Sequence, residues 1–272
     1  DKDKADKKAD AWAELVRSRK IGYFALLRNL RNILEQAPEL TDDAVKLLTD
    51  ENLIRKSLVL PFRYRTAIDA LEQADVPNRQ RQKVVRALSQ AVDRSLANVP
   101  RFDGRTLVAM DCSGSMLGKP MKIGSLFASV LYKVNDADLM LFSGDARHVT
   151  FNADDATLTI AQRIEDKAEW SGTNFHAIFQ RANRAYDRIV ILSDMQAWIG
   201  HWTPKEQFDR YVQKTRQRPR IYSFDLAGYG TLQFPEREVY ALAGFSDKAF
   251  DTMRFLEEDK SALIREIERI EL

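Results

Sequence analysis

Three short polar clusters contain the residues of this sequence that are best suited to chemistry. They read DCSGS at residues 111–115, SGTN at residues 171–174 and SD at residues 193–194. Their two carboxylates and three of their hydroxyls form a set of hard oxygen donors, which Mg²⁺ and other hard divalent cations prefer. The clusters therefore predict a site for Mg²⁺ or a similar ion.

The expected ligands divide into charged and neutral donors. Asp111 and Asp194 would balance the charge of the ion, and neutral oxygens would come from Ser113, Ser115 and Thr173. An octahedral ion keeps water at one or more positions, and an anionic group of a partner could replace that water. The residues thus indicate a recruitment site more than a closed structural one.

The same residues fit a capping role or a catalytic role less well. Asp and Ser after a strand can merely cap the next helix, but three such clusters exceed what capping needs. A nucleophilic Ser113 would require a Gly-x-Ser-x-Gly turn, and Asp111 stands where its first glycine should be. A phosphohydrolase with Asp111 as nucleophile would require a second carboxylate two residues later, where this chain has Ser113. We therefore predict that the chain is not an enzyme.

These clusters need a sheet to hold them together. Strands are predicted at 105–111, 137–143, 147–151, 188–193, 220–225 and 238–243, and helices at 120–134, 156–168, 174–186, 205–216 and from 249 onward. Alternating strands and helices predict a doubly wound, Rossmann-like α/β domain with a mostly parallel sheet. Ligands bind beyond the carboxyl ends of such strands, where all three clusters fall.

The first hundred residues have a helical pattern. Helices are predicted at 21–37, from Thr41 through 48, from Pro61 through 71, and at 78–98. The first ten residues alternate Lys and Asp, and we expect no fixed structure there. The predicted organisation is a charged tail at 1–10, an all-α helical-repeat segment at 11–100 and an α/β domain at 101–272.

The overall charge hides a difference between the two halves. The net charge of +2 is the sum of +4 over residues 1–100 and −2 over the remainder. One cysteine excludes disulfides within the chain and Cys-rich zinc sites. No apolar run approaches the ~20 residues of a membrane-spanning helix, and the charged start is unlike a signal peptide. We expect a cytoplasmic protein.

The pattern Asp-x-Ser-x-Ser, then Ser-Gly-Thr-Asn, then Leu-Ser-Asp resembles the metal-ion-dependent adhesion site of von Willebrand factor A domains. The resemblance covers most of residues 104–272. It implies the same five ligands, with the two aspartates often acting through water, and a protein partner that presents an exposed Asp or Glu. Trp198 and Trp202 follow Asp194, and they could anchor such a partner or plug the core.

A second resemblance concerns the first half. The segments KIGYFALLRNLRN at 20–32 and LPFRY at 60–64 resemble the carboxyl-terminal stretch of the TROVE module, a ring of helical repeats in the Ro ribonucleoprotein autoantigen and its bacterial relatives. The resemblance implies a small non-coding, Y-RNA-like RNA as partner of the full-length parent, with no DNA and no membrane. About 90 helical residues cannot close a ring, so the chain is expected to be a fragment or a reduced relative.

Basic residues of the first half are the candidate RNA contacts, because Lys and Arg bind phosphates. They are Arg28, Arg31, Lys56, Arg63, Arg65, Arg79, Arg81, Lys83 and Arg86. The same residues could instead form solvated or ion-paired helix faces. The aromatic residues Tyr23, Phe24, Phe62 and Tyr64 fit core packing better than base stacking. Two functions stay open: a Ro-like RNA-binding protein with a metal site, and an A-domain adaptor that binds only protein.

Overall fold

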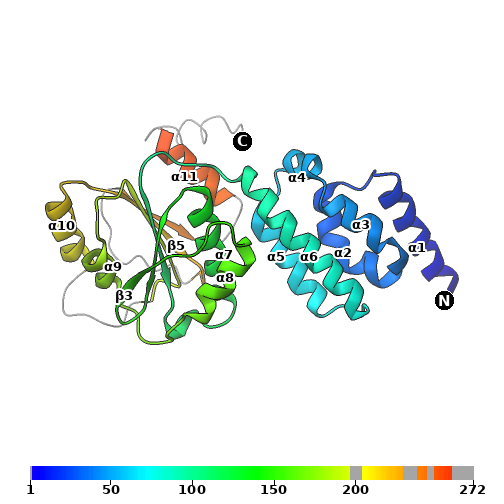
Figure 1. Cartoon of the computed structure of the whole chain (residues 1–272), viewed down its shortest axis with the longest axis horizontal. Helices are drawn as coiled ribbons and strands as arrows, with labels where there is room; N and C mark the ends of the chain where they lie inside the picture. Colours follow the sequence, from blue (N-terminus) through cyan, green and yellow to red (C-terminus); the bar gives the residue numbers. More distant parts are fainter. Residues whose placement is uncertain (1, 197–203, 229–237, 244–247, 259–272) are drawn as a thin grey trace, which may run out of the picture. The chain divides into compact units, whose positions relative to one another are not determined.

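The protein divides into two compact units (Figure 1). The computed structural model describes residues 2–196, 204–228, 238–243 and 248–258. We call Asp1–Val99 the helical unit and Pro100–Leu272 the α/β unit. No helix in these described ranges combines the length and apolar character needed to cross a bilayer. Trp198 and Trp202 lie outside the described residues.

The helical unit contains six α-helices in its described part. They are α1 (Lys2–Arg17), α2 (Tyr23–Gln36), α3 (Thr41–Leu48), α4 (Glu51–Ser57), α5 (Pro61–Glu72) and α6 (Asn78–Ser95), with short 3-10 turns at Pro38–Leu40 and Leu96–Asn98. Helix α2 packs on α3 and α5, and α6 packs on α3, α4 and α5. The apolar core between them includes Leu30, Ile33, Leu48, Leu71 and Leu88.

Two features of this unit differ from the sequence prediction. The segment 1–10 was expected to lack fixed structure, yet α1 begins at Lys2. Val16 is buried and the Trp12 indole donates a hydrogen bond to Gln36, which anchors the end of α1, and extending an existing helix costs little. Helix α4 was missed, although Asp50 caps it through the N–H groups of Asn52 and Leu53.

The α/β unit carries one six-stranded sheet. Its strands are β1 (Thr106–Asp111), β2 (Asp138–Phe142), β3 (Ala146–Val149), β4 (Arg188–Ser193), β5 (Arg220–Asp225) and β6 (Val239–Ala243). The strand order is β3-β2-β1-β4-β5-β6, and only β3 runs antiparallel to its neighbour in this sheet. The predicted doubly wound α/β fold is confirmed.

Helices cover both faces of this sheet (Figure 1). They are α7 (Lys119–Val134), α8 (Thr157–Asp166), α9 (Phe175–Arg181), α10 (Pro204–Thr215) and α11 (Lys248–Glu258). Helices α9 and α10 pack on one face through Phe175, Phe179 and Phe208. On the other face, Phe127 of α7 stacks on Phe250 of α11 with ring centroids 5.0 Å apart.

One predicted helix is too long. It was expected at 174–186, but α9 ends at Arg181. The chain turns there because Tyr186 belongs to the core: its hydroxyl donates to Asp138 at 2.7 Å and its N–H donates to the Tyr211 hydroxyl at 2.9 Å. Burial of this ring takes precedence over another turn of helix.

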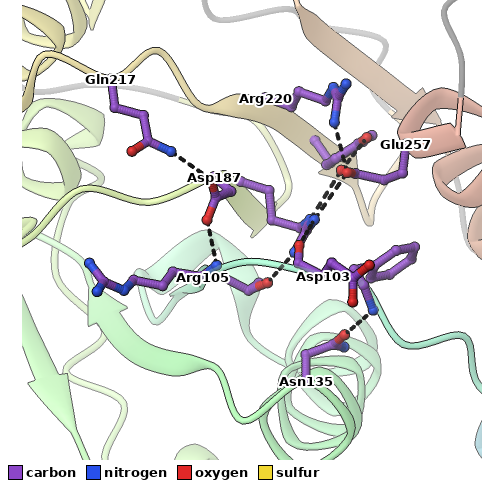
Figure 2. A network of polar contacts seen from close by, with 11 residues as sticks. Asp103, Arg105, Asn135, Asp187, Gln217, Arg220 and Glu257 are labelled. Atoms are coloured by element: carbon purple, nitrogen blue, oxygen red, sulfur yellow. Dashed lines mark hydrogen bonds and ion pairs between the residues drawn. The ribbon is translucent and has the colours of Figure 1, made fainter.

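The amino ends of the parallel strands carry a polar network (Figure 2). At its centre Arg188 is 2% exposed and donates to both carboxylate oxygens of Glu257 on α11, each at 3.0 Å. Arg220 donates to the same carboxylate at 2.8 Å. Arg188 also donates to the Asp103 carbonyl, and its guanidinium lies 5.2 Å from the centroid of the Phe102 ring. The network therefore fastens α11 and the segment before β1 to the sheet.

Candidate functional site

The first predicted ligand lies at the carboxyl end of the central strand. Strands β1 and β4 are parallel neighbours, so their ends meet at one edge of the sheet. Asp111 is fully buried there. One carboxylate oxygen accepts the N–H of Ser113 at 2.9 Å, and the other accepts the Ser193 hydroxyl at 2.6 Å. Both oxygens are thus held in fixed directions.

The loop after β1 brings two predicted ligands together. The hydroxyls of Ser113 and Ser115 lie 3.2 Å apart, with Ser113 buried and Ser115 exposed. Between them, the Gly114 N–H donates to the Ser171 carbonyl at 2.9 Å. A Cβ on Gly114 would meet the Trp170 carbonyl oxygen at 3.2 Å, so glycine permits this close approach of the second loop.

The second loop carries Thr173, which is 1% exposed. Its position follows from hydrogen bonds on both sides. The Trp170 N–H donates to the Cys112 carbonyl at 3.0 Å, and the Asn174 N–H donates to the Ser143 carbonyl at 2.8 Å. The loop is therefore held between the ends of β1 and β2.

Asp194 follows β4 and is fully buried. Its Oδ1 accepts the Gln196 N–H at 3.3 Å. Its Oδ2 is buried and has no hydrogen-bond partner among the described residues. An ionised oxygen in this state costs free energy unless a positive group reaches it. Asp194 Oδ2 is therefore a buried polar atom without a hydrogen-bond partner in the described structure, at the carboxyl end of β4.

The pKa of Asp111 also indicates that a positive charge would stabilise this end of the sheet. Burial, with a smaller contribution from the charge of Asp194, raises the pKa of Asp111 to about 6, against the lowering effect of hydrogen bonds from Ser193 and Ser113. The charge of the neighbouring Asp194 therefore adds to the effect of burial in disfavouring the ionised form of Asp111. A cation between them would relieve both effects.

The donor set at this edge fits a hard cation. Among the described residues, no group of three or more His, Cys, Asp or Glu side chains is placed to hold a metal ion. A cation here would depend on the carboxylates of Asp111 and Asp194 and on hydroxyl oxygens. The thiol of Cys112 does not compete, because burial raises its pKa to about 12.

The nine basic candidates of the helical unit do not behave alike. Five are engaged within the fold: Arg31 with Glu35, Arg63 over the ring of Phe24, Arg65 with Asp69, Arg81 with the carbonyls of Ala74 and Val76, and Lys83 with Asp42. The other four are exposed and make no ion pair or hydrogen bond through their side chains with the described residues. They are Arg28, Lys56, Arg79 and Arg86.

The four aromatic residues of this unit also divide. Tyr23, Phe62 and Tyr64 are buried, as the core-packing interpretation predicts. Phe24 is 46% exposed, so that interpretation is wrong for this residue.

Comparison with known proteins identifies the relatives of this chain. A family model described as the TROVE domain matches residues 2–120. RNA-binding protein RO60 of Deinococcus radiodurans is 26% identical over 265 residues, covering 85% of this chain and 48% of that protein. The crystal structure of the Deinococcus radiodurans RO (RSR) protein aligns with a TM-score of 0.70 and 22% identity, over 87% of this chain and 53% of that chain.

The chain is a relative of the Ro-type TROVE proteins.

The extent of the match is informative. The chain spans about half the length of the two proteins that it matches. The TROVE match continues beyond the helical unit, through β1 and the loop that holds Ser113 and Ser115. The structural match covers both units, and we call the α/β unit the A domain from here on, after the von Willebrand factor A fold.

The role of Ser193 in this chain was not predicted from the sequence. Its hydroxyl donates to Asp111 and accepts the Met195 N–H at 2.9 Å. The available signal was its place: it ends the strand beside β1 and directly precedes Asp194. A polar residue in an otherwise apolar buried strand indicates a partner across the sheet.

The raised pKa of Asp111 predicts a pH dependence of stability in metal-free buffer. The folded state holds the proton more tightly than the unfolded chain, whose ordinary pKa is 3.8. The resulting stability is complete below that ordinary pKa and disappears as the pH rises through about 6. We expect the A domain to lose about 3 kcal/mol between about pH 3 and pH 7 from this group.

Urea unfolding in EDTA across this pH range checks the expectation. Asp111→Asn keeps an acceptor for the Ser113 N–H but cannot ionise, so this part of the pH dependence should vanish in the variant. Parallel stability profiles for Asp111→Asn and the unaltered chain would contradict the assignment.

Proposed function

We propose that this chain acts within an RNA-binding protein of the Ro type and that its helical unit contributes contacts to small non-coding RNA. The proposal is supported by similarity to a protein named for RNA binding. It is supported further by the exposed cations of the helical unit that have no partner in the described structure, Arg28, Lys56, Arg79 and Arg86. Such cations can neutralise phosphates and release their counterions without first breaking an ion pair within the protein.

Two of these cations lie on one face of α6 and give a direct test. Arg79 and Arg86 are seven residues apart, which places them on one side of a helix. The double change Arg79→Ala with Arg86→Ala is expected to weaken binding of a small structured RNA. It should also reduce the slope of log affinity against log salt by about 1 to 2. Fluorescence anisotropy at several salt concentrations measures both quantities.

A matched control exists in the A domain. Lys214 and Arg216 are also exposed, and their side chains make no ion pair or hydrogen bond with the described residues. Replacing both with alanine makes the same change in net charge. If this pair lowers the affinity as much as the α6 pair, the helical unit has no special role. If the unaltered chain binds no RNA, the protein-only adaptor becomes the better function.

We propose for the A domain that Asp111, Ser113, Ser115, Thr173 and Asp194 hold a divalent cation such as Mg²⁺. The observation that carries this proposal is the buried Oδ2 of Asp194, which lacks a partner in the described structure beside a second buried carboxylate. When bound, the cation would supply a Lewis-acidic position for a carboxylate of a protein partner. Ser115 is exposed, so an ion held there would be open to a partner at the surface.

The chain's own residues favour a binding role for this site over a catalytic one. Both carboxylate oxygens of Asp111 accept hydrogen bonds within the fold, from the Ser113 N–H and from the Ser193 hydroxyl. Neither oxygen is therefore left without a partner to attack a substrate. Ser113 lies beside the hydroxyl of Ser115, and neither hydroxyl has a histidine as hydrogen-bond partner in the described part of the chain. Recruitment of an acidic group therefore fits the arrangement better than hydrolysis.

A further inference from the structure

An exposed aromatic ring and a guanidinium form a pair on the surface of the helical unit. Phe24 belongs to the first turn of α2, Arg63 to the first turn of α5, and these two helices pack together. The Arg63 guanidinium carbon lies 5.4 Å from the centroid of the Phe24 ring. Phe24 remains 46% exposed. We call these two residues the Phe24–Arg63 pair.

The helix turns that carry the pair are firmly anchored. Next to Phe24, the buried Tyr23 donates its hydroxyl to the Leu48 carbonyl at 2.8 Å. On both sides of Arg63, Phe62 and Tyr64 are buried. The pair therefore lies on a preorganised surface, and a ligand that used it would pay little to order the backbone.

A second exposed cation, Arg28, lies on α2 beyond the pair. Arg28 lies four residues after Phe24, on the same helix face and about 6 Å farther along the axis. It is exposed, and its side chain has no partner among the described residues. The acidic group farther along, Glu35, is already occupied: its carboxylate accepts Arg31 at 2.9 Å and the Asp75 N–H at 3.0 Å.

We propose that the Phe24–Arg63 pair is a stacking platform for an unpaired base of single-stranded RNA, with Arg28 on the adjoining phosphate. The proposal rests on the RNA-binding function proposed above and adds the site and the form of RNA. Aromatic rings and guanidinium planes are the surfaces on which proteins stack splayed-out bases. An exposed aromatic ring can stack on the face of a base, and the arginines beside it complement the negative charge of the phosphate.

The same chemistry disfavours duplex RNA at this place. A base inside a helix is already stacked on its neighbours, so Phe24 could reach it only after unpairing. A protein partner would also find an exposed aromatic residue, but the free charge of Arg28 favours a polyanion. We therefore expect preference for single strands over duplexes.

Fluorescence anisotropy with labelled oligouridine and oligoadenosine, and with a duplex of equal length, tests the platform on the full chain. Phe24→Ala is expected to weaken single-strand binding about 10-fold, as loss of one stacked base does. It should leave the salt slope unchanged, because no phosphate contact is lost. Phe24→Trp should restore the affinity, and Arg28→Ala should lower the salt slope by about 1.

Leu117→Ala is the matched control, since it removes an apolar side chain that is 70% exposed in the A domain. Circular dichroism verifies that each variant is folded. If Phe24→Ala binds like Leu117→Ala while the arginine variants weaken binding, the stacking platform is wrong and RNA binding stands. If the unaltered chain binds no oligonucleotide and no structured RNA, the RNA function itself fails.

Discussion

Replacing Glu257 with glutamine is expected to lower the free energy of unfolding of the A domain by about 3 kcal/mol or more. The carboxylate of Glu257 accepts hydrogen bonds from Arg188, Arg220 and the Tyr222 hydroxyl (Figure 2). An amide keeps one acceptor but carries no charge. The guanidinium of Arg188, which is 2% exposed, would then be buried without its counter-charge.

The protonation of Glu257 supports the same expectation. Burial alone would raise its pKa, but the hydrogen bonds and charge of Arg188, with Tyr222 and Arg220, outweigh burial and the pKa is lowered. The ionised form is thus the one that the fold stabilises. Because Arg188 also binds the Asp103 carbonyl and lies over Phe102, the damage should extend from α11 to the segment before β1.

Urea unfolding followed by tryptophan fluorescence measures the effect, since three of the four tryptophans belong to the A domain. Glu258→Gln is the matched control. That neighbouring carboxylate is exposed and lies 3.9 Å from Arg254. Equal unfolding midpoints for Glu257→Gln and Glu258→Gln would show that the buried pair does not stabilise the domain.

Replacing Asp194 with asparagine is expected to abolish the stabilisation of the A domain by Mg²⁺. A ligand that binds only the folded state adds about 2.7 kcal/mol when its free concentration is about 100 times its Kd. For a domain of this size, this corresponds to a rise in Tm of about 5 to 10 °C. Asparagine retains the acceptor for the Gln196 N–H but removes the charge at Oδ2, the buried oxygen that lacks a partner in the described structure.

The neighbouring strand provides a stringent control. Strand β5 also ends in an aspartate, Asp225, whose carboxylate accepts the N–H groups of Ala227 and Gly228. Asp225→Asn should leave the Mg²⁺-dependent rise in Tm intact. Thermal melts in Mg²⁺ and in EDTA distinguish the variants, and a full rise in Asp194→Asn would remove this residue from the site.

Much of the A domain could be predicted because buried parallel strands have a strong pattern. The apolar run of β4 and its position between helices predicted a covered sheet, and the ends of parallel strands must meet at one edge. The polar clusters that follow β1 and β4 were therefore predicted to lie together. The position of Ser193 indicated a partner across the sheet, but that this partner is Asp111 was not predictable, since it depends on the register of two strands far apart in sequence.

The helical unit shows where periodicity misleads. Apolar residues at three-residue steps placed Phe24 on the core face with Leu27 and Leu30. A helix turns every 3.6 residues, so a spacing of three drifts around the axis. The spacing of Tyr23, Leu27 and Leu30 by four and three residues follows the buried stripe more closely. Phe24 falls instead on the exposed stripe of Arg28, which the basic residues themselves could have indicated.

Direct titration of Mn²⁺, followed by the loss of its free-ion electron paramagnetic resonance signal, tests the metal site most directly. We expect the unaltered chain to bind one ion with competition by Mg²⁺, and Asp111→Asn and Asp194→Asn to bind about 100-fold more weakly or not at all. Binding that is absent from the unaltered chain, or equally tight in both variants, would contradict a cation site at the carboxyl edge of this sheet.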